Sequence, residues 1–135
     1  MTDHINRAQR SRNMAAVRSK DTKPEMVVRK LVYGLGYRYR LHLGSLPGRP
    51  DLAFPAKRKA IFVHGCFWHR HPECSRASMP KIRQAFWKAK FEKNVARDAR
   101  NIAALEATEW KILTLWECEI KNDQWLRKAI QRFLN

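Results

Sequence analysis

Residues 47–74 hold most of the side chains in this chain that could do chemistry. Their sequence, PGRPDLAFPAKRKAIFVHGCFWHRHPEC, contains the carboxylate of Asp51, three of the five histidines and two of the three cysteines. Asp51 could hold a divalent cation against a phosphate. The Glu-x-Lys motif that completes many such sites on the next strand is missing, because Val63 and His64 stand in its place. A hard cation at Asp51 would therefore need backbone carbonyls, water and the phosphate oxygens of a nucleic acid to complete its oxygen shell.

Two histidines and one glutamate are candidates for moving or positioning a proton near this carboxylate. His64 and His69 are expected to titrate near neutrality, so either could take a proton from an attacking water. Glu25 is expected in the first turn of a helix and could orient one of these imidazoles or a metal-bound water. A capping glutamate is usually structural, and a histidine beside a strand is usually a hydrogen-bonded surface residue. Their concentration around Asp51 favours catalytic roles.

Three cysteines and one histidine have the residue types of a closed zinc site. Cys66, His71 and Cys74 lie close together in sequence, and Cys118 follows a distant apolar run. Three thiolates and an imidazole make a full tetrahedral set, so the zinc would be structural. Free buried cysteines are the alternative. The odd number of cysteines in a short chain without a signal peptide indicates reduced thiols.

Two consecutive aromatic residues stand out in a polar segment. Phe67 and Trp68 cannot both be placed in a core by strand periodicity, so we expect them to be exposed. Exposed rings in a basic field can stack on bases or insert between base steps, at a cost that favours distorted pairs. Trp87 on a predicted helix is a third candidate, and Met14 could press from the other groove.

Hydrophobic periodicity and turn residues predict the elements that carry these side chains. Thr22, Pro24 and Glu25 have the capping-box arrangement that begins a helix, which Gly34 and Gly36 end. Residues 37–43 form a strand or a loop, and residues 51–54 and 60–64 form an antiparallel pair. A helix over 80–107, a buried strand over 110–116 and a helix over 123–134 complete the chain. This order predicts a single-domain α/β fold with a mixed sheet flanked by helices on both faces.

The net charge predicts a polyanionic partner. Lys and Arg number 28 against 12 Asp and Glu, which leaves +16 at pH 7. Such a field favours DNA or RNA through phosphate neutralisation and counterion release. Residues 1–20 are expected to form a basic arm or helix on the DNA, with a solvated terminus as the alternative. No window of about 18 apolar residues and no signal peptide supports a membrane, so a cytoplasmic, nucleoid-associated protein is expected.

Several stretches in order carry a resemblance to a known family: RSRNMAAVRSKDTKPE, SLPGRPD, IFVHGCFWH, FWKAKFEKNVARDARNI and WKILTLWEC. From about Arg10 to Cys118, the chain resembles the very short patch repair (Vsr) endonucleases of bacteria. The resemblance implies a restriction-endonuclease-like, PD-(D/E)xK-type fold over residues 21–135. It also implies that the protein recognises T:G mismatches left by deamination of 5-methylcytosine and nicks the thymine strand on its 5′ side, using magnesium.

Carried over position by position, the resemblance implies a role for each candidate residue. Asp51 would bind magnesium together with the Val63 carbonyl, with His69 as general base. His64 and Glu25 would support that base. The zinc ligands would be Cys66, His71, Cys74 and Cys118. The DNA contacts would be the intercalating side chains Phe67, Trp68 and Trp87, with Met14 opposite, and the mismatch-reading pair Lys90 and Asn94.

Two departures from the family pattern concern the metal sites. Val63 stands where some members have Thr, which matters little where only its carbonyl binds. Pro72-Glu73 makes the loop before Cys74 one residue longer than in some relatives. That insertion leaves His71 and Glu73 as alternatives for the zinc site.

Two other functions fit parts of the pattern. A restriction-like or homing nuclease with another target would not need the aromatic residues, and a zinc-stabilised DNA-binding module would not need Asp51 with His69. The family further implies a monomer that is linked functionally to a cytosine-C5 DNA methyltransferase and to a repair polymerase and ligase. The bases around the mismatch and the number of magnesium ions do not follow from the sequence.

Overall fold

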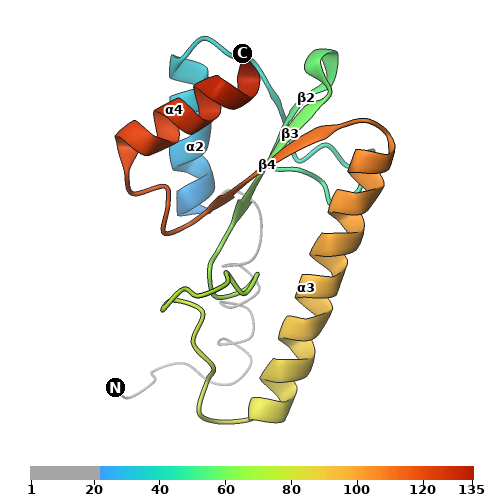
Figure 1. The fold of residues 1–135 in the computed structure, drawn as a ribbon, viewed down its shortest axis with the longest axis vertical. Coiled ribbons are helices and arrows are strands. Elements are labelled where there is room, and N and C mark those ends of the chain that lie inside the picture. The colour runs from blue at the N-terminus through green and yellow to red at the C-terminus, as the bar shows by residue number, and fades with distance from the viewer. Residues whose placement is uncertain (1–21) are drawn as a thin grey trace.

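The computed structural model describes residues 22–135, so the predictions for residues 1–20, Met14 included, lie outside the described part of the chain. Four strands form one sheet in sequence order: β1 (Arg40–Leu41), β2 (Leu52–Phe54), β3 (Lys59–His64) and β4 (Lys111–Trp116). The first three strands pair antiparallel, and β3 and β4 pair parallel. The long helix α3 (Gln84–Ala107) provides the crossover that a parallel pair requires (Figure 1). The predicted mixed α/β sheet is confirmed.

Helix α2 (Lys23–Gly34) begins where its capping residues predict. The Thr22 hydroxyl accepts a hydrogen bond from the Glu25 N–H at 3.3 Å, and Pro24 occupies the first turn. The buried positions of the helix are Glu25, Val28 and Val32. Because Glu25 lies on the same face as the two valines, the helix turns a carboxylate into the protein interior.

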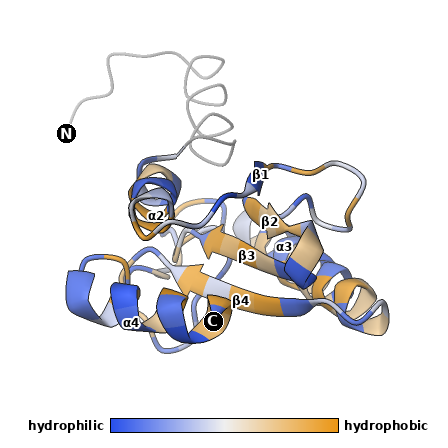
Figure 2. Cartoon of the chain, turned by 90° about the horizontal axis from the view of Figure 1, so that it is seen from above, coloured by the Kyte–Doolittle hydropathy of each residue, from blue (hydrophilic) through white to orange (hydrophobic). Residues whose placement is uncertain are grey.

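The main hydrophobic core lies between the sheet and two helices, α2 and α4 (Asp123–Leu134), which lie on the same side of the strands (Figure 1). Leu126, Ile130 and Leu134 of α4 are fully buried, and each contributes roughly 1.5–3 kcal/mol by its burial. The outer surface of α4 is hydrophilic while the strands are largely hydrophobic (Figure 2). The last helix therefore follows the predicted amphipathic pattern.

Helix α3 lies on the other side of the sheet and extends well past its end (Figure 1). Only Phe91, Asn94 and Leu105 of its 24 residues are buried. Leu105 is fully buried near the C-terminal end of the helix, whereas Phe91 belongs to an aromatic cluster with the loop that follows β3. The N-terminal half of α3 therefore supports that loop.

Three sequence expectations need correction. The possible strand over 37–43 is reduced to Arg40–Leu41. The long helix begins at Gln84, not near residue 80, because Arg83 takes a left-handed conformation with φ of 58°. The strand over 110–116 is mostly half-buried, with only Leu115 buried, because β4 is an edge strand of the sheet.

None of the helices in residues 22–135 combines the length and the apolar character that crossing a bilayer would require.

Candidate active site and metal centre

A large cleft of about 1240 Å³ lies between the start of α2, the ends of β2 and β3, and the middle of α3. Its lining includes six candidate ligands or proton carriers: Glu25, His42, Asp51, His64, His69 and Asp98. The turn that precedes Asp51 packs directly on α3. A Cβ on Gly48, which has φ of +76°, would lie 3.0 Å from the Asn101 Cβ, so a side chain there would push the turn off the helix.

Asp51, Glu25 and His42 form the first group in this cleft, called here the Asp51 cluster. One ligand atom from each lies within 4.8 Å of the others. The Val63 N–H donates to Asp51 Oδ2 at 2.7 Å, which brings the backbone of residue 63 against the carboxylate. Burial raises the pKa of Asp51 well above its usual range, and the nearby Glu25 charge adds to that effect.

Glu25 interacts with His42 and with a neighbouring arginine. The distance between His42 Nε2 and Glu25 Oε2 is 2.8 Å, and Arg29 Nη1 lies 3.5 Å from the same oxygen. The structure thus places Glu25 in the Asp51 cluster and pairs it with His42. Sequence reasoning missed His42, and no motif marks it, since it lies in the segment 37–43, whose residues fit a strand or a loop.

His64, His69 and Asp98 form the second group, called here the His69 cluster. His69 Nδ1 lies 2.6 Å from Asp98 Oδ2, and the two imidazoles stack with centroids 3.9 Å apart and planes 5° from parallel. Asp98 was also missed. The available signal was its spacing of four from Asn94 and eight from Lys90, which puts all three on one face of α3.

The two histidines differ sharply in environment. His64 is 5% exposed, and its Nδ1 has no hydrogen-bond partner in the described part of the chain. Burial, aided by the neighbouring His69, lowers the pKa of His64 to about 3. The expectation that His64 titrates near neutrality is therefore wrong, because desolvation disfavours its charged form. His69 has a 25% exposed side chain and a carboxylate partner, which makes it the better proton carrier of the two.

Cys66, His71, Cys74 and Cys118 converge at the end of β3 and β4, and are called here the Cys–His cluster. One ligand atom from each lies within 4.8 Å of the others. His71 Nδ1 is 3.6 Å from Cys66 Sγ and 3.4 Å from Cys118 Sγ. Glu73 is exposed and lies outside the cluster, which favours His71 as the fourth ligand.

The donor types of these clusters fit the metals that the sequence predicts. Burial raises the pKa of the Cys66 thiol, and a zinc ion would supply the positive charge that a buried thiolate lacks. In the cleft, the half-buried Asp51 carboxylate and the His64 Nδ1, which has no partner in the described part of the chain, are polar groups that a hydrated divalent cation with its phosphate ligand would satisfy. The residues present therefore fit both ions.

The aromatic residues pack together instead of standing free. Trp68 is only 9% exposed and Phe67 is half-buried, and both have ring contacts with Trp87. Phe67 and Trp68 were both expected to be exposed, and this expectation is wrong for Trp68. The N-terminal half of α3 supplies an apolar partner, Trp87, that strand periodicity cannot reveal. Both rings still line the cleft.

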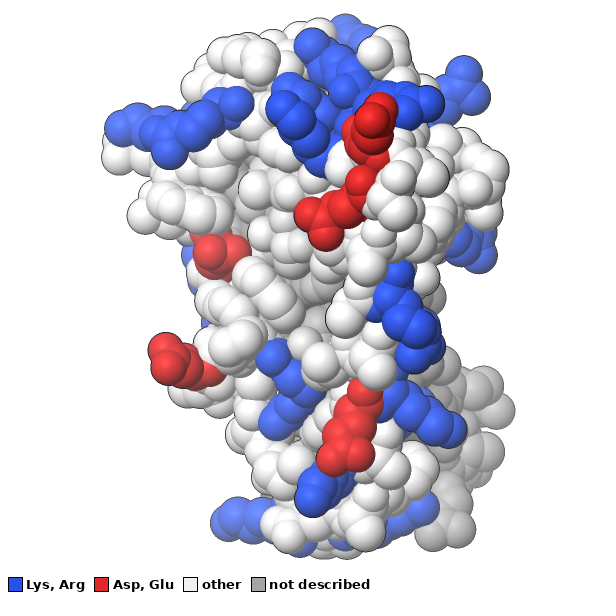
Figure 3. Space-filling view, turned by 45° about the vertical axis from the view of Figure 1, so that its right-hand side comes forward, with Lys and Arg blue, Asp and Glu red and all other residues white. Residues whose placement is uncertain are grey.

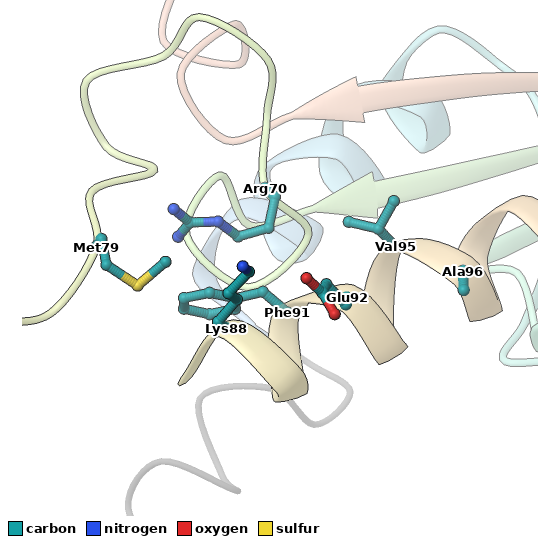
Figure 4. A pocket seen from close by; sticks show the side chains of 7 residues that line it. All are labelled: Arg70, Met79, Lys88, Phe91, Glu92, Val95 and Ala96. Atoms are coloured by element: carbon teal, nitrogen blue, oxygen red, sulfur yellow. The ribbon is translucent and has the colours of Figure 1, made fainter. Parts of the chain in front are cut away.

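Arg70 holds the loop with these rings against α3 (Figure 4). Its guanidinium lies 3.9 Å from the centroid of the Phe91 ring and donates to the carbonyl oxygens of Phe67, Ala77 and Ser78. A smaller hollow of about 370 Å³ lies beside it, between Met79 and Val95 (Figure 4). This hollow is largely apolar and holds none of the metal-ligand groups described above.

The predicted mismatch-reading pair lies on the same stretch of α3. Asn94 is 5% exposed and donates from Nδ2 to the Trp68 carbonyl oxygen at 3.2 Å. Lys90 is half-buried one turn earlier. Asn94 therefore ties the backbone at Trp68 to the helix that carries Asp98.

Comparisons with known proteins identify related DNA endonucleases. The family model for the DNA mismatch endonuclease Vsr matches residues 2–76. The type II nicking enzyme V.XorIIP of Xanthomonas oryzae pv. oryzae is 44% identical over 135 residues, which is 100% of this chain and 98% of that protein. The DNA mismatch endonuclease Vsr of Escherichia coli K12 is 42% identical over 121 residues, which is 90% of this chain and 77% of that protein.

A further nicking enzyme, V.NmeAIP of Neisseria meningitidis serogroup A, is 38% identical over 134 residues, 99% of this chain and 95% of that protein. The match to V.XorIIP spans the whole chain and so covers the Asp51 cluster, the His69 cluster and the Cys–His cluster. The chain belongs to the Vsr family of DNA mismatch endonucleases.

Proposed function

We propose that this endonuclease recognises T:G mismatches in double-stranded DNA and nicks the thymine strand on the 5′ side of the thymine, with magnesium as its cofactor. The observation that carries the proposal is one cleft that holds a half-buried carboxylate, Asp51, and an imidazole oriented by a second carboxylate, His69 with Asp98. A metal ligand and a positioned base are the two parts that phosphodiester hydrolysis needs.

Asp51 and the Val63 carbonyl would hold the magnesium ion. When bound, the ion would stabilise negative charge on the scissile phosphate. Asp51 is oriented for this role, because its Oδ2 accepts a hydrogen bond from the Val63 N–H. Glu25 and His42 lie beside it and complete a polar pocket.

His69 would take the proton from the attacking water. A hydrogen bond from its Nδ1–H to Asp98 leaves the lone pair on Nε2, which is the tautomer that a general base requires. His64 stacks on this ring and is neutral at physiological pH, so it supports the orientation of His69 without adding charge. Asp98 is thus a positioning residue for His69.

The aromatic cluster would provide mismatch selection. Phe67 and Trp68 line the cleft while packed on Trp87, so DNA that unstacks easily could exchange its base contacts for these ring contacts. Lys90, Asn94 and Met14 would contact the mismatch and its opposite face, and residues 1–20 would form a basic arm on the duplex. Lys and Arg side chains outnumber acidic ones over the face that Figure 3 shows, as phosphate contact requires.

The reactions that come before and after this nicking step are implied by its substrate and its product. A single nick beside thymine must be processed by a repair polymerase and a ligase, and T:G pairs arise where a cytosine-C5 methyltransferase has acted. We assign the fold to the restriction-endonuclease-like PD-(D/E)xK type, with a structural zinc in the Cys–His cluster, acting as a monomer in the cytoplasm on nucleoid DNA.

The test uses two duplexes that differ in one base, T:G and T:A, with each strand labelled separately. With magnesium, the protein should cut only the thymine strand of the T:G duplex, and chelation should stop the reaction. Double-strand cutting of the T:A duplex would instead support a restriction-like or homing nuclease. Binding without cleavage would support a DNA-binding module. A tiled set of T:G duplexes then gives the preferred neighbouring bases.

A further inference from the structure

We propose that His42 supplies an imidazole nitrogen to the divalent cation of the Asp51 cluster, and that this nitrogen gives the site a preference for manganese over magnesium. The proposal rests on the proposed function, because it concerns the same catalytic cation. With Asp51 and Glu25, His42 would be the third side-chain donor at a site where the sequence indicated a single carboxylate, that of Asp51. It also predicts a cation choice.

The geometry brings the three donors together in the folded chain. His42 Nε2 and Glu25 Oε2 are 2.8 Å apart, and both lie within 4.8 Å of a carboxylate oxygen of Asp51. Glu25 is 1% exposed and the His42 side chain is 14% exposed, so bulk water cannot replace these donors easily. All three residues line the large cleft.

Backbone contacts hold His42 and Glu25 at fixed positions. The His42 N–H donates to the Asp51 carbonyl oxygen at 3.3 Å, immediately after β1 pairs with β2. Glu25 is held by the cap at the start of α2, where its N–H donates to Thr22. The donors therefore come from two elements that the sheet and the helix cap fix independently, as a prebuilt site requires.

The charges of the cluster favour a cation. Glu25 is buried and Asp51 is half-buried, their carboxylate oxygens lie within 4.8 Å of each other, and the contact from Val63 to Asp51 is an uncharged N–H. Arg29 Nη1 lies 3.5 Å from Glu25 Oε2, and 20% of the Arg29 side chain is exposed. A divalent ion between the three donors would neutralise the remaining charge.

The alternative is that His42 is only a hydrogen-bond partner that orients Glu25. The two roles differ in which metals they favour. Imidazole nitrogen binds first-row transition metals such as manganese well, whereas magnesium prefers oxygen donors and retains its water. A ligand role therefore predicts that the preference for manganese depends on His42, and a hydrogen-bonding role predicts that the preference does not change when His42 is replaced.

Electron paramagnetic resonance of bound Mn²⁺ tests the assignment directly. Full-length protein, with its Cys–His cluster first saturated with zinc, is titrated with Mn²⁺ in the absence of DNA. We expect one bound Mn²⁺ with a ¹⁴N modulation in the spin-echo signal, and tighter binding of Mn²⁺ than of Mg²⁺ in competition. No ¹⁴N modulation in the wild-type protein would overturn the proposal.

Two matched variants identify the nitrogen. His42→Gln keeps a hydrogen-bonding group for Glu25 and should lose the ¹⁴N modulation. Its affinity for Mn²⁺ should fall by roughly tenfold or more, and its affinity for Mg²⁺ should change less than about threefold. His69→Gln, in the neighbouring group, should keep the modulation. His42→Asn is the second variant if His42→Gln unfolds, as checked by near-ultraviolet circular dichroism. Modulation that persists without His42, or that disappears with His69, would overturn the assignment.

The outcomes separate this proposal from the proposed function. Wild-type protein that nicks T:G duplexes with magnesium but shows no ¹⁴N modulation would refute only the role of His42. Protein that shows the His42-dependent modulation but does not nick T:G duplexes would support the ligand and refute the proposed reaction.

Discussion

His69 Nδ1 and Asp98 Oδ2 lie 2.6 Å apart, and the carboxylate comes from helix α3 while the imidazole comes from the loop after β3. The pair therefore depends on the docking of two segments that are distant in sequence. Asn94, one turn before Asp98, donates to the Trp68 carbonyl oxygen and fixes that docking. The orientation of the candidate base is thus set by α3 and not by its own strand.

Asp98→Asn should slow nicking of T:G duplexes by about 100-fold while binding changes little, because an amide cannot hold the same imidazole tautomer as firmly. Single-turnover nicking and duplex binding measure the two effects. Asp123→Asn, which changes a surface carboxylate paired with Arg127, is the control and should act like the parent. Equal rates for Asp98→Asn and the parent would remove Asp98 from the mechanism.

Asp51→Asn should abolish magnesium-dependent nicking, with a loss of roughly a thousandfold or more, and keep T:G binding within about threefold. The variant should also be no less stable than the parent in chelator, because burial disfavours the Asp51 charge that the substitution removes. Nicking, duplex binding and thermal melting are measured together. Glu106→Gln, an exposed carboxylate on α3, serves as control. Nicking at the parent rate would show that Asp51 is not a metal ligand.

Elemental analysis should find one zinc per chain. His71→Gln should lose the zinc and lower the melting temperature by about 10 °C, because the Cys–His cluster joins the loop after β3 to the end of β4. Glu73→Gln should retain the zinc, since Glu73 lies outside the cluster. If Glu73→Gln lost the zinc and His71→Gln kept it, Glu73 would be the fourth ligand instead of His71.

The pH dependence of folding should carry a signature of His64. Its pKa of about 3 in the folded state lies below the value of 6.5 that it has when solvated, so the unfolded chain binds the extra proton between these values. Stability should therefore fall as pH decreases, by about 1.4 kcal/mol per pH unit between roughly pH 6 and pH 4.

Asp51 contributes with the opposite sign, because its raised pKa makes the folded state bind the extra proton as pH falls. The measured quantity is therefore the difference in unfolding free energy between the parent and His64→Gln, in chelator, across this range. A difference that does not vary with pH would contradict the neutral burial of His64.

Phe67→Leu should reduce the preference for T:G over T:A duplexes by about tenfold, because a leucine cannot replace a stacked ring. Phe67 lines the cleft, whereas Phe86 is 45% exposed on α3 and does not. Phe86→Leu is therefore the matched control and should keep the preference. Competition binding with the two duplexes measures both variants, and an equal effect from both would assign the change to packing.

Local sequence signals predicted much of the fold. Thr22 and Glu25 marked the start of α2, and the apolar spacing of α4 gave its limits at Asp123–Leu134. These features depend on neighbours within one or two helical turns, which the sequence displays directly. The start of α3 was misplaced, because the left-handed backbone at Arg83 leaves no signature in residue types.

The site was harder to predict because its contacts join distant segments. His42 and Asp98 are unremarkable in their own segments and acquire partners only when the β1 region meets α2 and the loop after β3 meets α3. Trp68 looked exposed because its apolar partners lie on α3, some twenty residues later. Burial of His64 reversed the expectation about its pKa for the same reason.

A single tight turn, residues 65–71, presents His69 to the cleft and His71 to the thiols, with backbone hydrogen bonds from His69 to Gly65 and from His71 to Cys66. With the proposed zinc in the Cys–His cluster, a newly made chain that has not yet bound the ion would have this turn loose and His69, the proposed base, misaligned. Such a chain could still adhere to chromosomal DNA without breaking it. Binding of the ion would then have to precede DNA cleavage, which would protect the genome from an incompletely assembled nuclease.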